Sequence, residues 1–104
     1  MNGEEQPSDP AAVSHVACRL ARYLRANPLA GDTKEGIAQW WLGFASVPVD
    51  VVERALALLQ EAGVLETVRA ADGRVRYRRV STDAEGDACL DRFIAVHADS
   101  TTRH

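Results

Sequence analysis

The chain has 104 residues and a mass of 11.3 kDa, which is the size of one small domain. Hydrophobic residues make up 46% of it and charged residues 26%, as in ordinary globular proteins, and no apolar run reaches the roughly 18 residues of a membrane-spanning helix. The first residues are acidic and polar, unlike a secretory signal, and there are only two cysteines. We therefore expect a cytoplasmic protein with free thiols.

The formal net charge of −3 is spread unevenly along the chain. Residues 1–10 and 81–104 each carry a net charge of −3, whereas residues 11–80 carry +3. All the cations except Lys34 are arginine, which binds carboxylates and phosphates through paired hydrogen bonds, although a GC-rich genome would favour arginine as well. The pattern predicts a mildly basic body between two acidic ends.

A helix is predicted to follow a flexible acidic segment at residues 1–9. Ser8 and Asp9 offer capping oxygens just before Pro10, and apolar residues then recur at helical spacing. Pro28 ends the pattern, because the residue before a proline avoids the helical region.

A second, shorter helix is predicted from Asp32 onward. Asp32 with Glu35 three residues later matches a capping box, and Gly43 is the expected end. Trp40 and Trp41 are adjacent, so the helix can turn only one of them into the core. We expect the other to lie on a side face.

A third helix and a β-hairpin are predicted next. The helix starts at residues 46–48 and ends at Gly63. Asp72-Gly73, between two alternating segments, predicts a hairpin with a two-residue loop, which would pair Ala71 with Arg74. In that register one face packs on the helices and the other carries cations: the packed face holds Val68, Ala70, Val75 and Tyr77, and the charged face holds Arg69, Arg76 and Arg78.

The last predicted element is a helix from Asp83 to about Ala98, followed by a frayed tail at 99–104. Its apolar stripe holds Leu90, Phe93, Ile94 and His97. We expect this stripe to pack on the first helix or on a second copy of the chain.

This order of elements resembles that of a winged helix-turn-helix domain, over roughly residues 11–80. The resemblance rests on residues 51–65, where a leucine-rich helix ends in Gly63 and passes into Val64-Leu65, and on the hairpin tip at residues 72–77. It implies a mainly α fold with a small β-hairpin: three helices and a two-stranded wing over residues 10–80, with an additional helix over residues 81–98. Many such domains bind DNA through the third helix and the wing, and others bind proteins.

The third helix is predicted to present an acidic outer face. Asp50, Glu53 and Glu61 lie there with only one cation, Arg54, which opposes insertion into a DNA groove. The wing favours the opposite interpretation. Its arginines can contact a phosphate backbone or an anionic protein, or can simply keep an exposed sheet soluble; the candidate nucleic-acid or anion-binding residues are Arg54, Arg69, Arg74, Arg76 and Arg78.

Apolar residues between the second and third helices predict a surface for a protein partner, because exposed aromatic anchors are frequent at binding hot spots. The candidate protein-binding residues are Trp40, Trp41, Phe44, Val47 and Val49. Burial under the terminal segments would explain them equally well.

Catalytic and metal-binding motifs are weak. His15 and Cys18, and Cys89 and His97, lack the spacing of zinc ligands, and no phosphate-binding glycine loop or nucleophile motif occurs. We expect no enzyme activity, cofactor, metal or small-molecule substrate, and no membrane partner. The leading hypothesis is an adaptor or assembly subunit that binds another protein or a second copy of itself. The alternative is a small transcriptional regulator that binds double-stranded DNA through Arg54 and the wing.

Overall fold

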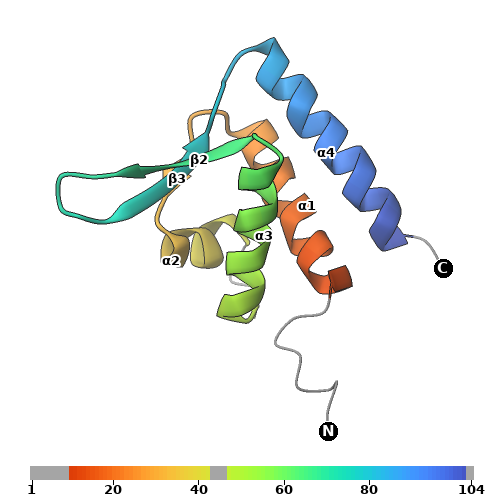
Figure 1. The fold of residues 1–104 in the computed structure, drawn as a ribbon, viewed down its shortest axis with the longest axis horizontal. Coiled ribbons are helices and arrows are strands. Elements are labelled where there is room, and N and C mark those ends of the chain that lie inside the picture. Colours follow the sequence, from red (N-terminus) through yellow and green to blue (C-terminus); the bar gives the residue numbers. More distant parts are fainter. Residues whose placement is uncertain (1–9, 43–46, 103–104) are drawn as a thin grey trace, which may run out of the picture.

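The computed structural model describes residues 10–42 and 47–102, with side chains up to residue 97. Within these residues the protein is mainly helical with a small three-stranded antiparallel sheet (Figure 1). The expected flexible segment at residues 1–9, Phe44 and the helix end at Gly43 lie outside the described residues. None of the described helices is long and apolar enough to cross a membrane.

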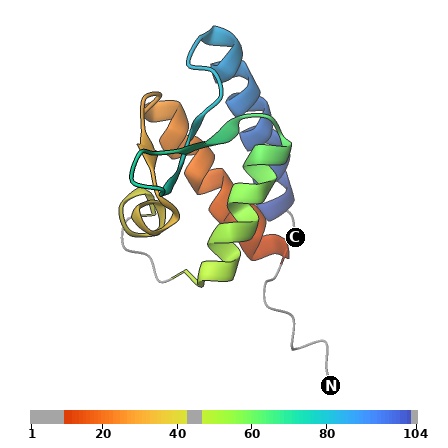
Figure 2. The ribbon, with the colours of Figure 1, turned by 60° about the vertical axis from the view of Figure 1, so that its left-hand side comes forward.

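Three helices build the core: α1 (Pro10–Ala26), α3 (Val49–Glu61) and α4 (Ala84–Thr102). Helix α1 lies between α3 and α4 (Figure 2). Its stripe of Leu20, Leu24 and neighbouring small residues is almost fully buried against both partners. Leu90 and Phe93 pack α4 against α1. This is one of the two arrangements expected for the apolar stripe of the last helix, the other being contact with a second copy of the chain. Helix α4 also continues past the predicted end at Ala98.

The second helix differs in detail from the prediction. Thr33, not Asp32, is the N-cap, since its hydroxyl accepts a hydrogen bond from the Gly36 N–H over 3.2 Å. One turn of α-helix, α2 (Lys34–Gly36), passes into a π-helical turn, η2 (Ile37–Trp41). The Leu42 N–H closes this turn on the Ile37 carbonyl at 3.3 Å. The wider turn keeps Ile37 and Trp41 on the buried side of the helix.

The sheet contains a strand that the sequence pattern did not predict. Strand β1 (Gly31–Asp32) pairs with β3 (Val75–Arg79), which pairs in turn with β2 (Leu65–Arg69). The β1 strand is too short to show any alternation of polar and apolar residues. Only its pairing with Tyr77 and Arg78 defines it.

The predicted hairpin is present, but its predicted register was wrong by one residue. Ala70, not Ala71, lies opposite Arg74, and the Ala70 N–H donates to the Arg74 carbonyl at 2.8 Å. The loop therefore has three residues, 71–73, and ends in Gly73 with a φ of +85°. A three-residue loop of this kind uses glycine at its left-handed position, so Asp-Gly suits this loop as well as the shorter one.

A shift of one residue changes which side chains share a face. Arg69 lies opposite Val75, and Val68 lies opposite Arg76, so the predicted separation into an apolar and a charged face was wrong. The core-facing side instead has Leu65 and Arg79 at its buried base, where the two strands leave the helices. Tyr77 packs against the core from the same side.

A buried arginine joins the sheet to two helices. The Arg79 Nε–H donates to the Ser81 carbonyl at 2.9 Å, and an Nη1–H donates to the Leu24 carbonyl near the end of α1 at 3.4 Å. Nη2 lies 3.0 Å from a carboxylate oxygen of Asp87, an ion pair without hydrogen-bond alignment. Asp87 also lies 3.5 Å from Arg25, which pairs with Asp91 at 3.0 Å. We call this set, Arg25, Arg79, Asp87 and Asp91, the charge seam.

Candidate binding surface

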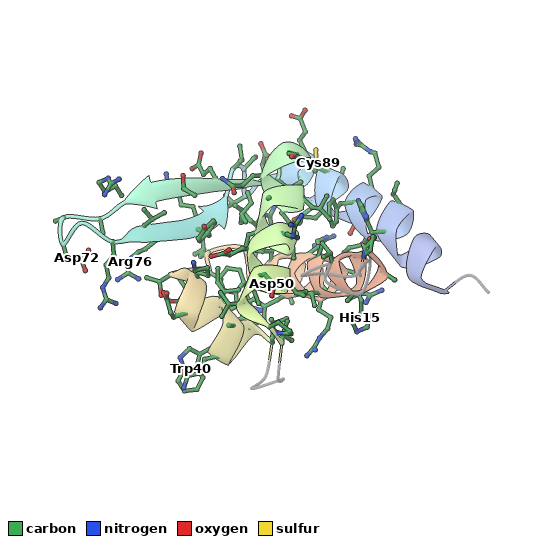
Figure 3. All side chains as sticks on the ribbon, turned by 60° about the horizontal axis from the view of Figure 1, so that its bottom comes forward. His15, Trp40, Asp50, Asp72, Arg76 and Cys89 are labelled. Carbon is green, nitrogen blue, oxygen red and sulfur yellow. The ribbon has the colours of Figure 1, made fainter. Side chains whose placement is uncertain are left out.

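Apolar side chains are exposed near the end of η2 and at the start of α3. Trp40 projects away from the core with 58% of its surface exposed (Figure 3), and Val49, at the start of α3, is 62% exposed. Val47 is half-buried and packs against the core. We call Trp40 and Val49 the apolar corner. It contains two of the five residues predicted to bind a protein.

Trp41 belongs to the core instead. Its ring stacks on Tyr23 of α1, with centroids 4.9 Å apart and 14° between the ring planes. Arg19, also on α1, donates a hydrogen bond to the Leu42 carbonyl at 2.9 Å, which holds the end of η2 against α1. These two contacts explain why Trp41 is the buried tryptophan. Both are made by residues of α1, far from the second helix in the sequence, so a local sequence pattern could not predict them.

The outer face of α3 is acidic, as predicted. Glu53, Arg54 and Glu61 are exposed, and Asp50 is half-buried. One oxygen of Asp50 is buried and has no hydrogen-bond partner in the part of the chain that the structure describes. Lys34 reaches Glu53 from α2 at 2.5 Å, and this hydrogen bond raises the pKa of Lys34. This ion pair neutralises one carboxylate of the acidic face and engages Lys34, the single lysine of the sequence.

The arginines of the wing differ in what they contact. Arg78 pairs with Glu66 across the two strands at 2.9 Å, and Arg69 donates to the Gly73 carbonyl at 3.1 Å. Arg74 and Arg76 are exposed and form no ion pair within the described residues. The outer half of the wing therefore carries two exposed cations without an ion pair among the described residues.

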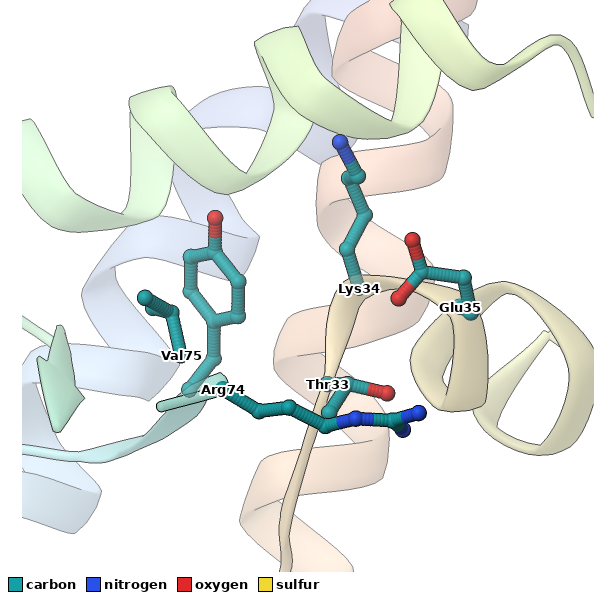
Figure 4. A pocket seen from close by; sticks show the side chains of 6 residues that line it. Thr33, Lys34, Glu35, Arg74 and Val75 are labelled. Atoms are coloured by element: carbon teal, nitrogen blue, oxygen red, sulfur yellow. The ribbon is translucent and has the colours of Figure 1, made fainter. Parts of the chain in front are cut away.

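A groove separates the wing from α2 (Figure 4). It has a volume of about 650 Å³ and is lined by Thr33, Lys34, Glu35, Arg74, Val75 and Tyr77. In the close view the Lys34 side chain points toward α3, while Arg74 extends from the wing along the mouth of the groove. Both charge signs line the groove, because Glu35 lies beside Lys34.

The surface thus combines an apolar corner, an acidic helix face and a basic wing. The sequence identified Trp40, Val49 and the exposed arginines, but missed Lys34, Val75 and Tyr77 as groove residues. Helical or strand periodicity carries no signal for a groove that forms between two distant elements. Neither a protein-family model, nor a curated protein, nor a solved structure matches this chain.

Proposed function

We propose that this chain is a non-enzymatic winged-helix module that binds another protein. The element order α1, β1, α2, α3, β2, β3 supports the winged-helix assignment. In it the β2–β3 hairpin is the wing, and α4 is an additional helix. The short β1 strand is consistent with this assignment, because its pairing with β3 joins the wing to the loop between α1 and α2. The free thiols of Cys18 and Cys89 support our placement of the protein in a reducing cytoplasm.

The observation that carries the protein-binding function is the apolar corner. Val49 opens α3, where a helix that reads DNA would present cations or amides to phosphates and base edges, and Trp40 is exposed on the preceding helix. Behind them, the outer face of α3 carries more acids than cations, which would oppose phosphate groups. Exposed tryptophan is instead a frequent anchor at protein interfaces.

Affinity purification with matched baits tests this function. The baits are the parent chain, Trp40→Ala and Val96→Ala, where Val96 is an equally exposed apolar residue on α4, 61% exposed. We expect the parent and Val96→Ala to retain the same proteins and Trp40→Ala to lose them. Identical sets of bound proteins for all three baits would rule out the apolar corner as the binding site.

Double-stranded DNA is the second candidate ligand, and the unpaired Arg74 and Arg76 favour it. Fluorescence anisotropy of a random duplex, titrated at several salt concentrations, measures this directly. If the wing contacts phosphates, binding should weaken steeply with salt, and Arg76→Ala should reduce the salt slope by about one. No binding at low salt would exclude the regulator hypothesis.

A further inference from the structure

The outer edge of β2 has backbone groups that the sheet does not use. In an antiparallel pair, alternate residues direct both N–H and C=O toward the partner strand. The Ala70 N–H bonds to Arg74, and the Val80 N–H bonds to the Val64 carbonyl, so the even-numbered residues of this strand bond to β3. The odd-numbered residues of β2, Leu65, Thr67 and Arg69, therefore direct their backbone groups outward.

This edge is open along its outer half. Thr67 and Arg69 are exposed, and within the described residues no hydrogen bond uses their outward N–H or C=O groups. On its β2 side the outer part of the wing has none of the described helices beside it, whereas α2 lies across the groove from β3 (Figures 1 and 3). Strand β1 covers only the opposite edge of the sheet, on β3.

The charges around this edge indicate which kind of strand would fit. Among the outer wing residues, Arg69 on the edge strand, with Arg74 and Arg76 on the β3 side of the hairpin, is opposed by Asp72 alone, because Glu66 is already paired with Arg78. This excess of cations would attract carboxylates. It would also make two wings repel each other, which disfavours a second copy of the chain at this edge.

We propose that the β2 edge of the wing binds an extended, acidic segment of a partner protein as an additional strand. The segment exchanges backbone hydrogen bonds with Thr67 and Arg69, and its carboxylates are attracted by Arg69 on the edge strand and by Arg76 on the adjacent strand β3. Main-chain bonds of this kind give affinity with little dependence on sequence, and the charged side chains add selectivity. The inference rests on the protein-binding function and assigns it a second contact, separate from the apolar corner.

Nuclear magnetic resonance of the full, ¹⁵N-labelled chain tests the proposal with a defined probe. The probe is a short, capped peptide of alternating glutamate and valine. We expect it to shift the amide signals of Leu65, Thr67 and Arg69 most strongly. Two comparison peptides should not bind: one in which lysine replaces glutamate, and one with a methyl group on every backbone nitrogen, which removes the donors along both edges.

A proline substitution on the strand provides the matched test in the protein. Thr67→Pro removes an outward N–H and no β2–β3 hydrogen bond, and edge strands tolerate proline at such positions. We expect it to weaken peptide binding about tenfold, as for the loss of one hydrogen bond, while Thr67→Val, which keeps the N–H, binds like the parent. If Thr67→Pro does not fold, the methylated peptide and Arg76→Glu in the intact chain give the same test.

Each result decides the proposal. Absence of shifts along β2, equal binding of the lysine peptide, a dimer of the parent chain that Thr67→Pro disrupts, or binding of a DNA duplex at these residues would each overturn it. Retention of proteins by the parent bait but not by Trp40→Ala, together with absence of peptide binding, would leave the protein-binding function intact and reject only the β2 edge. Identical proteins on all baits, with peptide shifts at β2, would reject the apolar corner and leave the β2 edge as the protein-binding site.

Discussion

Arginine has opposite roles on the two faces of the sheet. At its base, the Arg79 side chain is 1% exposed and joins β3 to α1 and α4 through the charge seam. One residue earlier, the Arg78 side chain is 58% exposed and only pairs across the hairpin. Successive side chains of a strand point to opposite faces, so adjacent residues of the same type differ completely in environment.

The tryptophan pair repeats this contrast between a packed side and an open side of the molecule. Trp41 stacks on Tyr23, whereas Trp40 projects outward. The packed side holds the fold together, and the open side, with the apolar corner and the outer wing, is the side for which we propose a partner. Substitutions on the packed side should therefore change stability, and those on the open side should change binding.

The largest expected loss of stability is that of Trp41→Ala. Removing a buried aromatic ring leaves a cavity, and the free energy of unfolding should fall by about 3–5 kcal/mol. Trp40→Ala should change it by less than about 1 kcal/mol. Urea denaturation of the two variants measures both values. Equal losses would mean that the two rings are similarly buried, which would remove the distinction between the two sides.

Arg79→Ala should follow, with a loss of about 3 kcal/mol, because it leaves the Leu24 carbonyl without its donor and Asp87 with only the more exposed Arg25 as a cation. The matched variant Arg78→Ala removes an exposed pair and should cost about 1 kcal/mol or less. Hydrogen exchange of α4 amides adds a local measurement, since loss of the charge seam should speed exchange there first. A stable Arg79→Ala protein with unchanged exchange would contradict a structural role for the charge seam.

Gly86→Ala is expected to destabilise the protein by about 1–3 kcal/mol, although alanine is ordinarily the better helix former. A Cβ atom at this position of α4 would lie 2.2 Å from the Ser81 carbonyl oxygen and 2.7 Å from Nη2 of Arg79. Ala88→Gly, at an exposed position of the same helix, is the control and should cost about 0.5–1 kcal/mol. A rise in melting temperature for Gly86→Ala would show that the start of α4 is not closely packed there.

The smallest expected effect concerns pH. Hydrogen bonds from the Ser81 hydroxyl and the Gly86 N–H hold the pKa of Asp83 below its ordinary value of 3.8. Because the folded state favours the charged carboxylate, its contribution to stability is complete above that ordinary value and is lost as the pH falls through the lowered pKa. Denaturation midpoints near pH 6 and pH 3 should therefore differ less in Asp83→Asn than in the parent, and an unchanged difference would contradict a stabilising role for these hydrogen bonds.

Local sequence patterns predicted the helical elements and the existence of the hairpin, but they could not fix the hairpin register. Asp72-Gly73 is compatible with a two-residue and with a three-residue loop. The choice depends on which residues the base of the hairpin buries against the helices, and here these are Leu65 and Arg79. Periodicity alone cannot anticipate a buried arginine.

The sequence by itself determined the order of the helices and the hairpin, the acidic face of α3, the surplus of arginine on the wing and the requirement that one tryptophan remain outside the core. Each of these follows from spacing along one element. Tertiary structure alone decided that Trp41 is the buried ring, that Arg79 joins the sheet to α1 and α4, and that β1 exists. Those outcomes depend on contacts between residues far apart in the chain, whose energies no local pattern contains.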